Sequence, residues 1–256
     1  MAQGFSQRSG IDYEETYSPV VDAITFRYLI NLAVHEKLEM RLIDVATTYL
    51  YCSLDHNIFM KVLEAFNMFE AYKNSKKVGS IRLQKSLYGL KQSGRMRYNR
   101  LSQFLLKEGY RNDPICPCVF IKRSGSDFVI TDVYVGDLNI SGTPNELSKV
   151  VECLTKEFEM KDLGKTKFCL GLQIEHLKNE IFVHQSTYTK NILKRFYMDK
   201  SHPLNTLMVV RPLGILNDPF RPQENEEELL DEAPYLTVIK ALIILPITLN
   251  QISVLQ

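Results

Sequence analysis

The feature that most constrains the fold is a pair of strand-like runs, 128–135 and 138–141, separated by the dipeptide Gly136-Asp137. The runs are rich in β-branched, aromatic and other apolar residues, which favour extended structure. Gly-Asp is one of the two-residue pairs that favour a tight hairpin. The sequence therefore predicts an antiparallel β-hairpin with Gly136 and Asp137 as its turn.

The rest of the chain mixes helical and extended patterns without a repeated βαβ unit. Apolar periodicity and capping residues predict helices at 26–35, 144–158 and 188–196. Their expected N-terminal caps are Asp22 or Thr25, Thr143 and Ser186. Further strands are expected at 41–45, 167–174 and 181–184, the last two joined around Lys178-Asn179. This order favours an α+β fold with an antiparallel sheet.

Composition limits the cellular compartments and the classes of partner expected for the protein. At 256 residues and 45% hydrophobic, the chain can bury a core, and its net charge of +1 supplies no overall attraction to a polyanion. Five cysteines without a CxxC pair favour a reducing environment. The start of the chain does not resemble a signal peptide, and the apolar stretch 241–249 is much shorter than the roughly 20 residues of a membrane span. We therefore expect an intracellular protein that is not secreted and has no membrane partner.

Two aspartates are placed where a sheet would bring carboxylates together. Asp44 lies near the end of the predicted strand 41–45, and Asp137 lies in the predicted hairpin turn. Turns favour aspartate for purely local hydrogen bonding, so this pair by itself is a weak indication of chemistry. A more specific string, Lys-Ser-Leu-Tyr-Gly-Leu-Lys-Gln at 85–92, lies between the two elements, in the order that a polymerase palm uses.

With that string, the sequence resembles the reverse transcriptase of copia-type retrotransposons. The matching strings are 4–7, 11–20, 43–45, 85–92, 157–164 and 170–174, and the likeness extends to about residue 236. The resemblance implies a polymerase palm with partial fingers and a short thumb-like region, in which an antiparallel sheet carries the site. It implies RNA or DNA template-primer and deoxynucleotide partners, in a cytoplasmic or particle-associated setting. It leaves the oligomeric state open.

The resemblance also assigns the centre of the site. Asp44 corresponds to the first metal-binding carboxylate, with the Val45 carbonyl beside it, and Asp137 to the second aspartate of a Tyr-x-Asp-Asp turn. Nucleotide addition is an in-line phosphoryl transfer assisted by paired Mg²⁺ ions, which require hard oxygen ligands. Gly136 occupies the position of the first aspartate of that turn. Magnesium binding is therefore expected to be weakened.

Other residues receive roles from the same resemblance. Tyr49 would lie under the nucleotide sugar and exclude a ribose 2′-hydroxyl, and Gln92 would help to seat the nucleotide. The residues expected to meet phosphates are Lys85, Lys91, Arg95 and Arg100. Leu170 and Gly171 would belong to the hairpin that grips the primer. Without the resemblance, Tyr49 is a core aromatic residue, Gln92 a surface amide, and the basic residues a solvated face.

The sequence departs from the family pattern in three places. The first is Gly136, where the carboxylate is missing. Asp132 cannot replace it, because it lies four residues before Gly136, about 13 Å away at about 3.3 Å per residue. Basic residues expected to hold the triphosphate would precede Ala2, and Arg97 stands where the family usually has tryptophan.

We expect a polymerase that is impaired by Gly136 and by the missing N-terminal string. The alternatives are a non-catalytic remnant that binds nucleic acid or a protein partner, or a chain without a selected function.

The predicted organisation has three parts. Residues 1–202 hold the fingers, the palm and the start of the thumb. Residues 203–234, rich in proline, asparagine and glutamate, are predicted to form a linker. Residues 235–256 are predicted to be a degraded tail.

Overall fold

The computed structural model of the chain describes residues 2–46, 48–61, 80–177, 180–202, 235–244 and 253–255. The chain divides into two compact units. The first consists of Met1–Lys167, Lys178–Ile181 and Val254–Gln256, and the second of Phe168–Leu177 and Phe182–Ser253. The predicted linker 203–234 lies outside the described residues.

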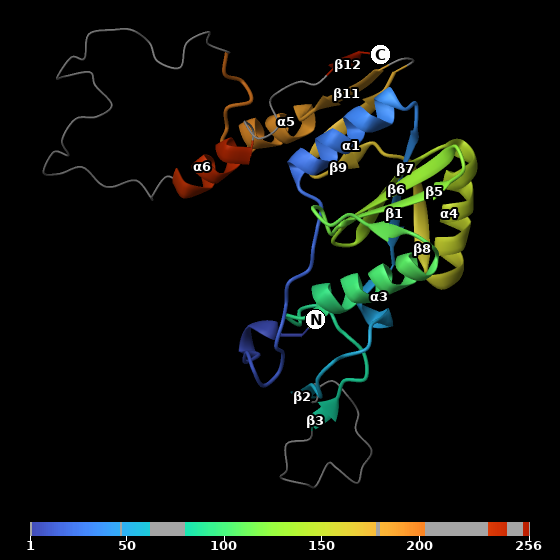
Figure 1. The fold of residues 1–256 in the computed structure, drawn as a ribbon. Helices are drawn as coiled ribbons and strands as arrows, with labels where there is room; N and C mark the ends of the chain where they lie inside the picture. The colour runs from blue at the N-terminus through green and yellow to red at the C-terminus, as the bar shows by residue number, and fades with distance from the viewer. Residues whose placement is uncertain are drawn as a thin grey trace, which may run out of the picture. The chain divides into compact units, whose positions relative to one another are not determined.

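The first unit is built on a six-stranded sheet of order β4-β5-β6-β7-β1-β8 (Figure 1). Its strands are β1 (Glu39–Val45), β4 (Arg111–Asn112), β5 (Val119–Ser124), β6 (Asp127–Tyr134), β7 (Asp137–Gly142) and β8 (Met160–Lys165). Each strand pairs antiparallel with its neighbour in this sheet. The prediction of mixed helix and strand with an antiparallel sheet is therefore confirmed.

The central hairpin of this sheet differs from the prediction by one residue. Tyr134 of β6 pairs with Asp137 of β7, so the two turn residues are Val135 and Gly136 and not Gly136 and Asp137. Asp137 also pairs with Asp44 of β1, and this second partner extends β7 to include it. As a consequence Val135 adopts a φ of 37°, a left-handed conformation that a β-branched residue rarely takes.

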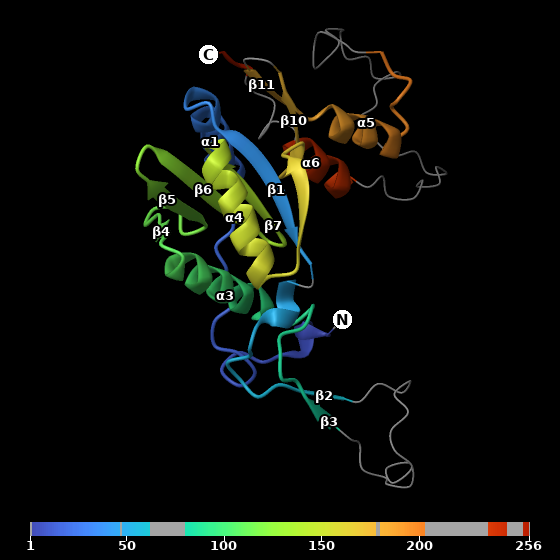
Figure 2. The ribbon, with the colours of Figure 1, turned by 90° about the vertical axis from the view of Figure 1, so that its right-hand side faces the viewer.

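Helices cover both faces of the sheet. Ile43, Leu138 and Ile140 are completely buried on one face, and α4 (Pro144–Glu157) lies across it (Figure 2). α1 (Ala23–His35) packs on the opposite face, near β7. The Asp22 side chain accepts hydrogen bonds from the backbone N–H groups of Ile24 and Thr25, so Asp22, and not Thr25, is the cap of α1.

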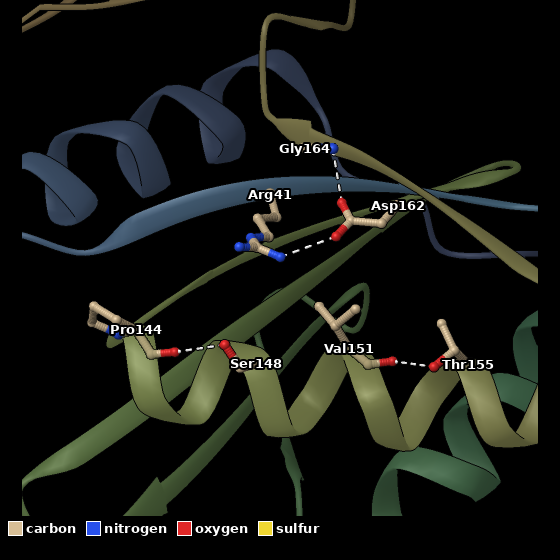
Figure 3. A network of polar contacts seen from close by, with 7 residues as sticks. All are labelled: Arg41, Pro144, Ser148, Val151, Thr155, Asp162 and Gly164. Carbon is tan, nitrogen blue, oxygen red and sulfur yellow. Dashed lines mark hydrogen bonds and ion pairs between the residues drawn. The ribbon is translucent and has the colours of Figure 1, made fainter.

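The edge strand β8 is attached to β1 by side chains as well as by backbone. Arg41 Nη1 forms an ion pair with Asp162 Oδ2 at 3.0 Å, and the other oxygen of Asp162 accepts from Gly164 N at 2.8 Å (Figure 3). The register between the strands shifts between Arg41 and Ile43, which marks a β-bulge. On the exposed side of α4, Ser148 and Thr155 donate to backbone carbonyls four residues earlier.

The first unit contains further elements outside the six-stranded sheet. They are η1 (Gly4–Ser6), η2 (Thr48–Tyr51), the antiparallel pair β2 (Phe59–Lys61) and β3 (Ser80–Arg82), and α3 (Ser93–Lys107). η2 follows β1 directly, and α3 packs against η2. The polypeptide that leaves Asp44 therefore meets α3.

A second sheet has the order β12-β11-β10-β9. Its strands are β9 (Phe168–Cys169), β10 (Leu172–His176), β11 (Glu180–His184) and β12 (Ser253–Leu255). The single strand predicted at 167–174 is wrong, because Leu170 and Gly171 take left-handed φ values of 53° and 75° and divide it into β9 and β10. The residues Lys178 and Asn179, predicted to join two strands, lie outside the described residues.

Two helices belong to the second unit. They are α5 (Ser186–Arg195), whose N-terminal cap is Gln185 and not the predicted Ser186, and α6 (Tyr235–Ile244). The Tyr188 hydroxyl donates to the backbone carbonyl of Ala241 at 3.3 Å, which joins α5 to α6. Within the described part of the chain, no helix has both the length and the apolar character needed to cross a membrane.

Candidate active site

The structure brings together the two aspartates that the sequence singled out. Asp44 and Asp137 are directly opposite each other in β1 and β7, so their side chains share one face of the sheet. Both are half-buried. Burial raises the pKa of Asp137 above its usual value, the negative charge of Asp44 raises it further, and the positive charge of Arg97 opposes both effects.

The hairpin turn is held against the end of β1. The backbone N–H of Val45 donates to the carbonyl oxygen of Gly136 at 3.1 Å. The Val45 side chain is buried on the other face of the sheet, so only its backbone lies near the carboxylates. A Cβ atom added to Gly136 would lie 4.0 Å from Asp44 Oδ1, which is ordinary van der Waals contact. A side chain at position 136 would therefore extend beside the Asp44 carboxylate.

The ligand set for a metal is incomplete. Carboxylate oxygens are suitable ligands for a hard divalent cation, but Asp44 and Asp137 supply only two carboxyl groups. Within the described ranges, no three histidine, cysteine, aspartate or glutamate residues are grouped so that they could hold a metal ion. Gly136, next to Asp137 in the hairpin turn, contributes no side chain. The residues present therefore do not fit a site for a pair of metal ions.

Arg97 is the site residue whose position the sequence did not predict. It lies on α3, is only 5% exposed, and interacts electrostatically with Asp137, Tyr49, Tyr88 and Cys52. Its burial lowers the pKa of the guanidinium. Among the described residues, its Nη2 has no hydrogen-bond partner. A signal was available in the sequence, because position 97 falls on the four-residue spacing of the buried positions 93, 97, 101 and 105.

The two predicted nucleotide-binding side chains have different surroundings. Tyr49, in η2, is half-buried and meets the ring of Tyr88 edge-on, with 4.6 Å between ring centroids. Gln92 is completely buried, so its reading as a surface amide is wrong. Its Nε2 donates to the Asp12 carbonyl and its Oε1 accepts from Gln7, both at 3.0 Å. Gln92 thus ties the N-terminal segment to the start of α3.

Most of the predicted phosphate-binding residues make contacts within the chain. Lys91 Nζ lies 5.3 Å from the ring centroid of Tyr13, and Arg100 forms an ion pair with Glu157. Arg95 donates to a backbone carbonyl at 3.4 Å, and Lys85 is exposed. In the second unit, Leu170 and Gly171 form the turn between β9 and β10. The roles of these residues in nucleic-acid binding stay predictions.

A buried polar network lies deeper on the Asp44 face of the sheet. Asp132 is 1% exposed, and its Oδ2 accepts from Asn139 Nδ2 at 2.8 Å. Asn139 Oδ1 in turn accepts from the Thr166 hydroxyl at 2.7 Å. Burial raises the pKa of Asp132 to about 7, against a partial opposing effect of the Asn139 hydrogen bond. Asp132 therefore belongs to the interior of the sheet and does not join Asp44 and Asp137.

Comparison with known proteins agrees with this arrangement. A family model described as "Reverse transcriptase (RNA-dependent DNA polymerase)" matches residues 1–210. The chain is 36% identical over 210 residues to the "Retrovirus-related Pol polyprotein from transposon TNT 1-94" of Nicotiana tabacum, an alignment that covers 80% of this chain and 15% of that polyprotein. Identity to the corresponding polyprotein from transposon RE1 of Arabidopsis thaliana is 30% over 213 residues, covering 83% and 14%.

A more distant relative is the "Transposon Ty1-H Gag-Pol polyprotein" of Saccharomyces cerevisiae, 24% identical over 251 residues, covering 90% of this chain and 13% of the relative. The chain thus spans only 13–15% of the length of these curated relatives. Members of the matching family depend in general on metal ions and act on nucleic-acid template-primers with nucleotides. Because the family model covers most of the chain and includes both Asp44 and Asp137, the chain belongs to the reverse transcriptase family, as the domain found in copia-type Pol polyproteins.

Proposed function

We propose that the six-stranded sheet with α1, α3 and α4 is the palm of a reverse transcriptase domain. The segment from η1 to β3 is proposed as part of the fingers, and the β9–β10 turn as the start of a thumb-like region. The observation that carries the proposal is the direct pairing of Asp44 with Asp137 in two central strands. The ancestral activity is RNA-directed DNA synthesis, with Mg²⁺ as the metal because both side chains offer hard oxygen ligands.

We also propose that the present chain is impaired as a polymerase. The support is local: two carboxylates converge where a third would extend from position 136, and a buried guanidinium lies near them. Loss even of a residue that only supports a ligand weakens metal sites by roughly 10–100-fold, and loss of a direct ligand is expected to cost more.

Primer extension tests the impairment. The full chain is incubated with an RNA template annealed to a DNA primer, deoxynucleotides and Mg²⁺ or Mn²⁺, beside the matched variant Asp44→Asn. We expect the two proteins to give indistinguishable, background incorporation. Metal-dependent incorporation by the unmodified chain that Asp44→Asn abolishes would contradict the impairment and support the ancestral activity.

A second candidate function is nucleic-acid binding without synthesis. The segment 81–100 contains four arginines and two lysines and no acidic residue, although the whole chain has a net charge of only +1. Such a local excess of positive charge supports contacts to phosphates without reading of sequence. Lys85, exposed in the part of this segment before α3, is the clearest candidate.

Salt dependence of binding tests this candidate. Fluorescence anisotropy with a labelled template-primer gives the slope of log affinity against log salt, and each lost phosphate contact reduces it by roughly 0.9 for a duplex. Lys85→Ala is expected to reduce the slope, whereas Lys107→Ala, at the far end of α3, is the matched control and is expected to leave it unchanged. Equal effects of both substitutions would show that binding depends on the overall positive charge and not on a phosphate contact made by Lys85.

A further inference from the structure

Arg97 is a buried cation without a full set of acceptors. It is 5% exposed, on the buried side of α3, and its Nη2 is unpartnered among the residues described. Removing a charged group from water costs several kcal/mol unless other charges and hydrogen bonds compensate. The neighbouring groups must therefore explain why a guanidinium is tolerated at this position.

Among the described residues that act electrostatically on Arg97, Asp137 is the one with a carboxyl group. Tyr49 and Tyr88 offer phenol groups and Cys52 a thiol, whereas Asp137 offers a carboxyl group that lies beside Asp44. α3 packs against η2, the segment that follows Asp44, so the helix that carries Arg97 is held at this end of the sheet. The positive charge of the guanidinium thus acts on Asp137, one member of the Asp44 and Asp137 pair.

This pair has room for one more acceptor. Position 136 has no side chain, and a Cβ there would lie 4.0 Å from Asp44 Oδ1 without meeting any closer atom outside its chain neighbours. A carboxylate at this position would lie beside Asp44 and next in the chain to Asp137, the carboxyl group on which the guanidinium acts. It would therefore either complete a metal site or accept a hydrogen bond from the unpartnered Nη2.

We propose that Arg97 is a resident cation that competes with divalent metal for the carboxylates at this end of the sheet, and that it would capture a carboxylate restored at position 136. Arg97 and Gly136 then act together. Gly136 supplies no carboxylate, so the ligand set stays incomplete, and the positive charge of the guanidinium opposes the binding of a divalent cation. The inference concerns metal binding alone. It does not depend on whether the chain synthesises DNA, and it goes beyond the impairment attributed above to Gly136.

The test is a double-mutant cycle read by Mn²⁺ binding, with titration calorimetry or electron paramagnetic resonance on the full chain. We expect Gly136→Asp and Arg97→Met to raise affinity separately by less than about threefold, and the double variant to raise it by at least about tenfold, the range typical of one supporting group at a metal site. Arg97→Lys with Gly136→Asp retains the positive charge and is expected to bind as weakly as Gly136→Asp alone. Adding Asp44→Asn to the double variant is expected to abolish the gain.

A melting experiment without metal keeps the inference testable if Arg97→Met does not fold. In EDTA, Gly136→Asp is expected to melt at a higher temperature than the unmodified chain, because the unpartnered guanidinium gains an acceptor. Gly136→Asn brings a side chain of similar size without charge and is the matched control. A lower melting temperature for Gly136→Asp than for Gly136→Asn in EDTA, or full metal affinity from Gly136→Asp alone, would overturn the proposal.

Discussion

Asp132 and Asp137 lie on the same face of the central hairpin, but their carboxyl groups are accommodated in opposite ways. Asp132 is fully buried and bonded to the neutral amide of Asn139, and its pKa is raised to about 7. Asp137 is half-buried at the end of the strand, beside Asp44 and near Arg97. The interior of the sheet thus tolerates a carboxyl group by hydrogen bonding it to a neutral partner. The rim, partly open to water, gathers several charged groups.

Asn139 is suited to the interior because its amide both donates and accepts. It donates to Asp132 and accepts from Thr166, so one side chain serves two buried polar neighbours. At the rim, Asp44 and Asp137 can only accept hydrogen bonds, and the compensating charge is that of Arg97 on a different element, which acts on Asp137. Substitutions at both places test this contrast.

The largest effect is expected from Asn139→Leu, which keeps a similar size and removes both polar functions. Near pH 8 we expect a loss of about 3–5 kcal/mol in the free energy of unfolding, because a buried carboxylate is left uncompensated. Urea unfolding measures this change. The double variant Asp132→Leu with Asn139→Leu is expected to recover part of the loss. Equal losses in the single and double variants would show that packing, and not charge, is responsible.

The next prediction concerns pH. The pKa of Asp132 rises from 3.8 to about 7 on folding, so the folded state binds one more proton than the unfolded state between these values. This group's contribution to stability is therefore fully present below about pH 4 and is lost as pH rises to about 7, at about 1.4 kcal/mol per pH unit. Asp132→Asn is expected to flatten this part of the profile. A profile identical in both proteins would assign the pH dependence to other groups.

A smaller change of the opposite sign is expected at the rim. Asp44→Asn removes the like charge that faces Asp137 and is expected to increase stability by about 0.5–1 kcal/mol at pH 8 and low salt, and less at high salt. Thermal melts at two salt concentrations measure this effect. Asp162→Asn is the matched control, because it removes the partner of Arg41 and is expected to decrease stability slightly or not at all.

The smallest effect is expected in the hairpin turn. Val135 has a φ of 37°, so Val135→Gly is expected to relieve backbone strain and increase stability by roughly 0.5 kcal/mol, since the entropy lost by glycine offsets part of the gain. At the other end of β6, Gly125 has a φ of 67°, and Gly125→Ala is the converse control, expected to decrease stability. A destabilising effect of Val135→Gly in chemical denaturation would show that the valine side chain makes a compensating contact.

Local features of the fold were predictable from the sequence. The strand-rich runs 128–135 and 138–141 predicted the central hairpin, and Asp22 was a predicted cap of α1. Family strings distributed over the chain identified the reverse transcriptase family. These signals depend on a few neighbouring residues each, because turn chemistry, capping and strand preference are properties of short segments.

The tertiary structure decided the features that depend on residues far apart in the chain. The turn moved to Val135 and Gly136 because Asp137 has pairing partners on both sides, Tyr134 and Asp44. The burial of Gln92 followed from contacts with residues 80 and 85 positions earlier. The charge of Arg97 acquired its significance only when α3 was placed near Asp137. The four-residue spacing on α3 indicated the burial of Arg97. Its electrostatic neighbours and the burial of Gln92 are set by long-range packing, and so no local pattern contained them.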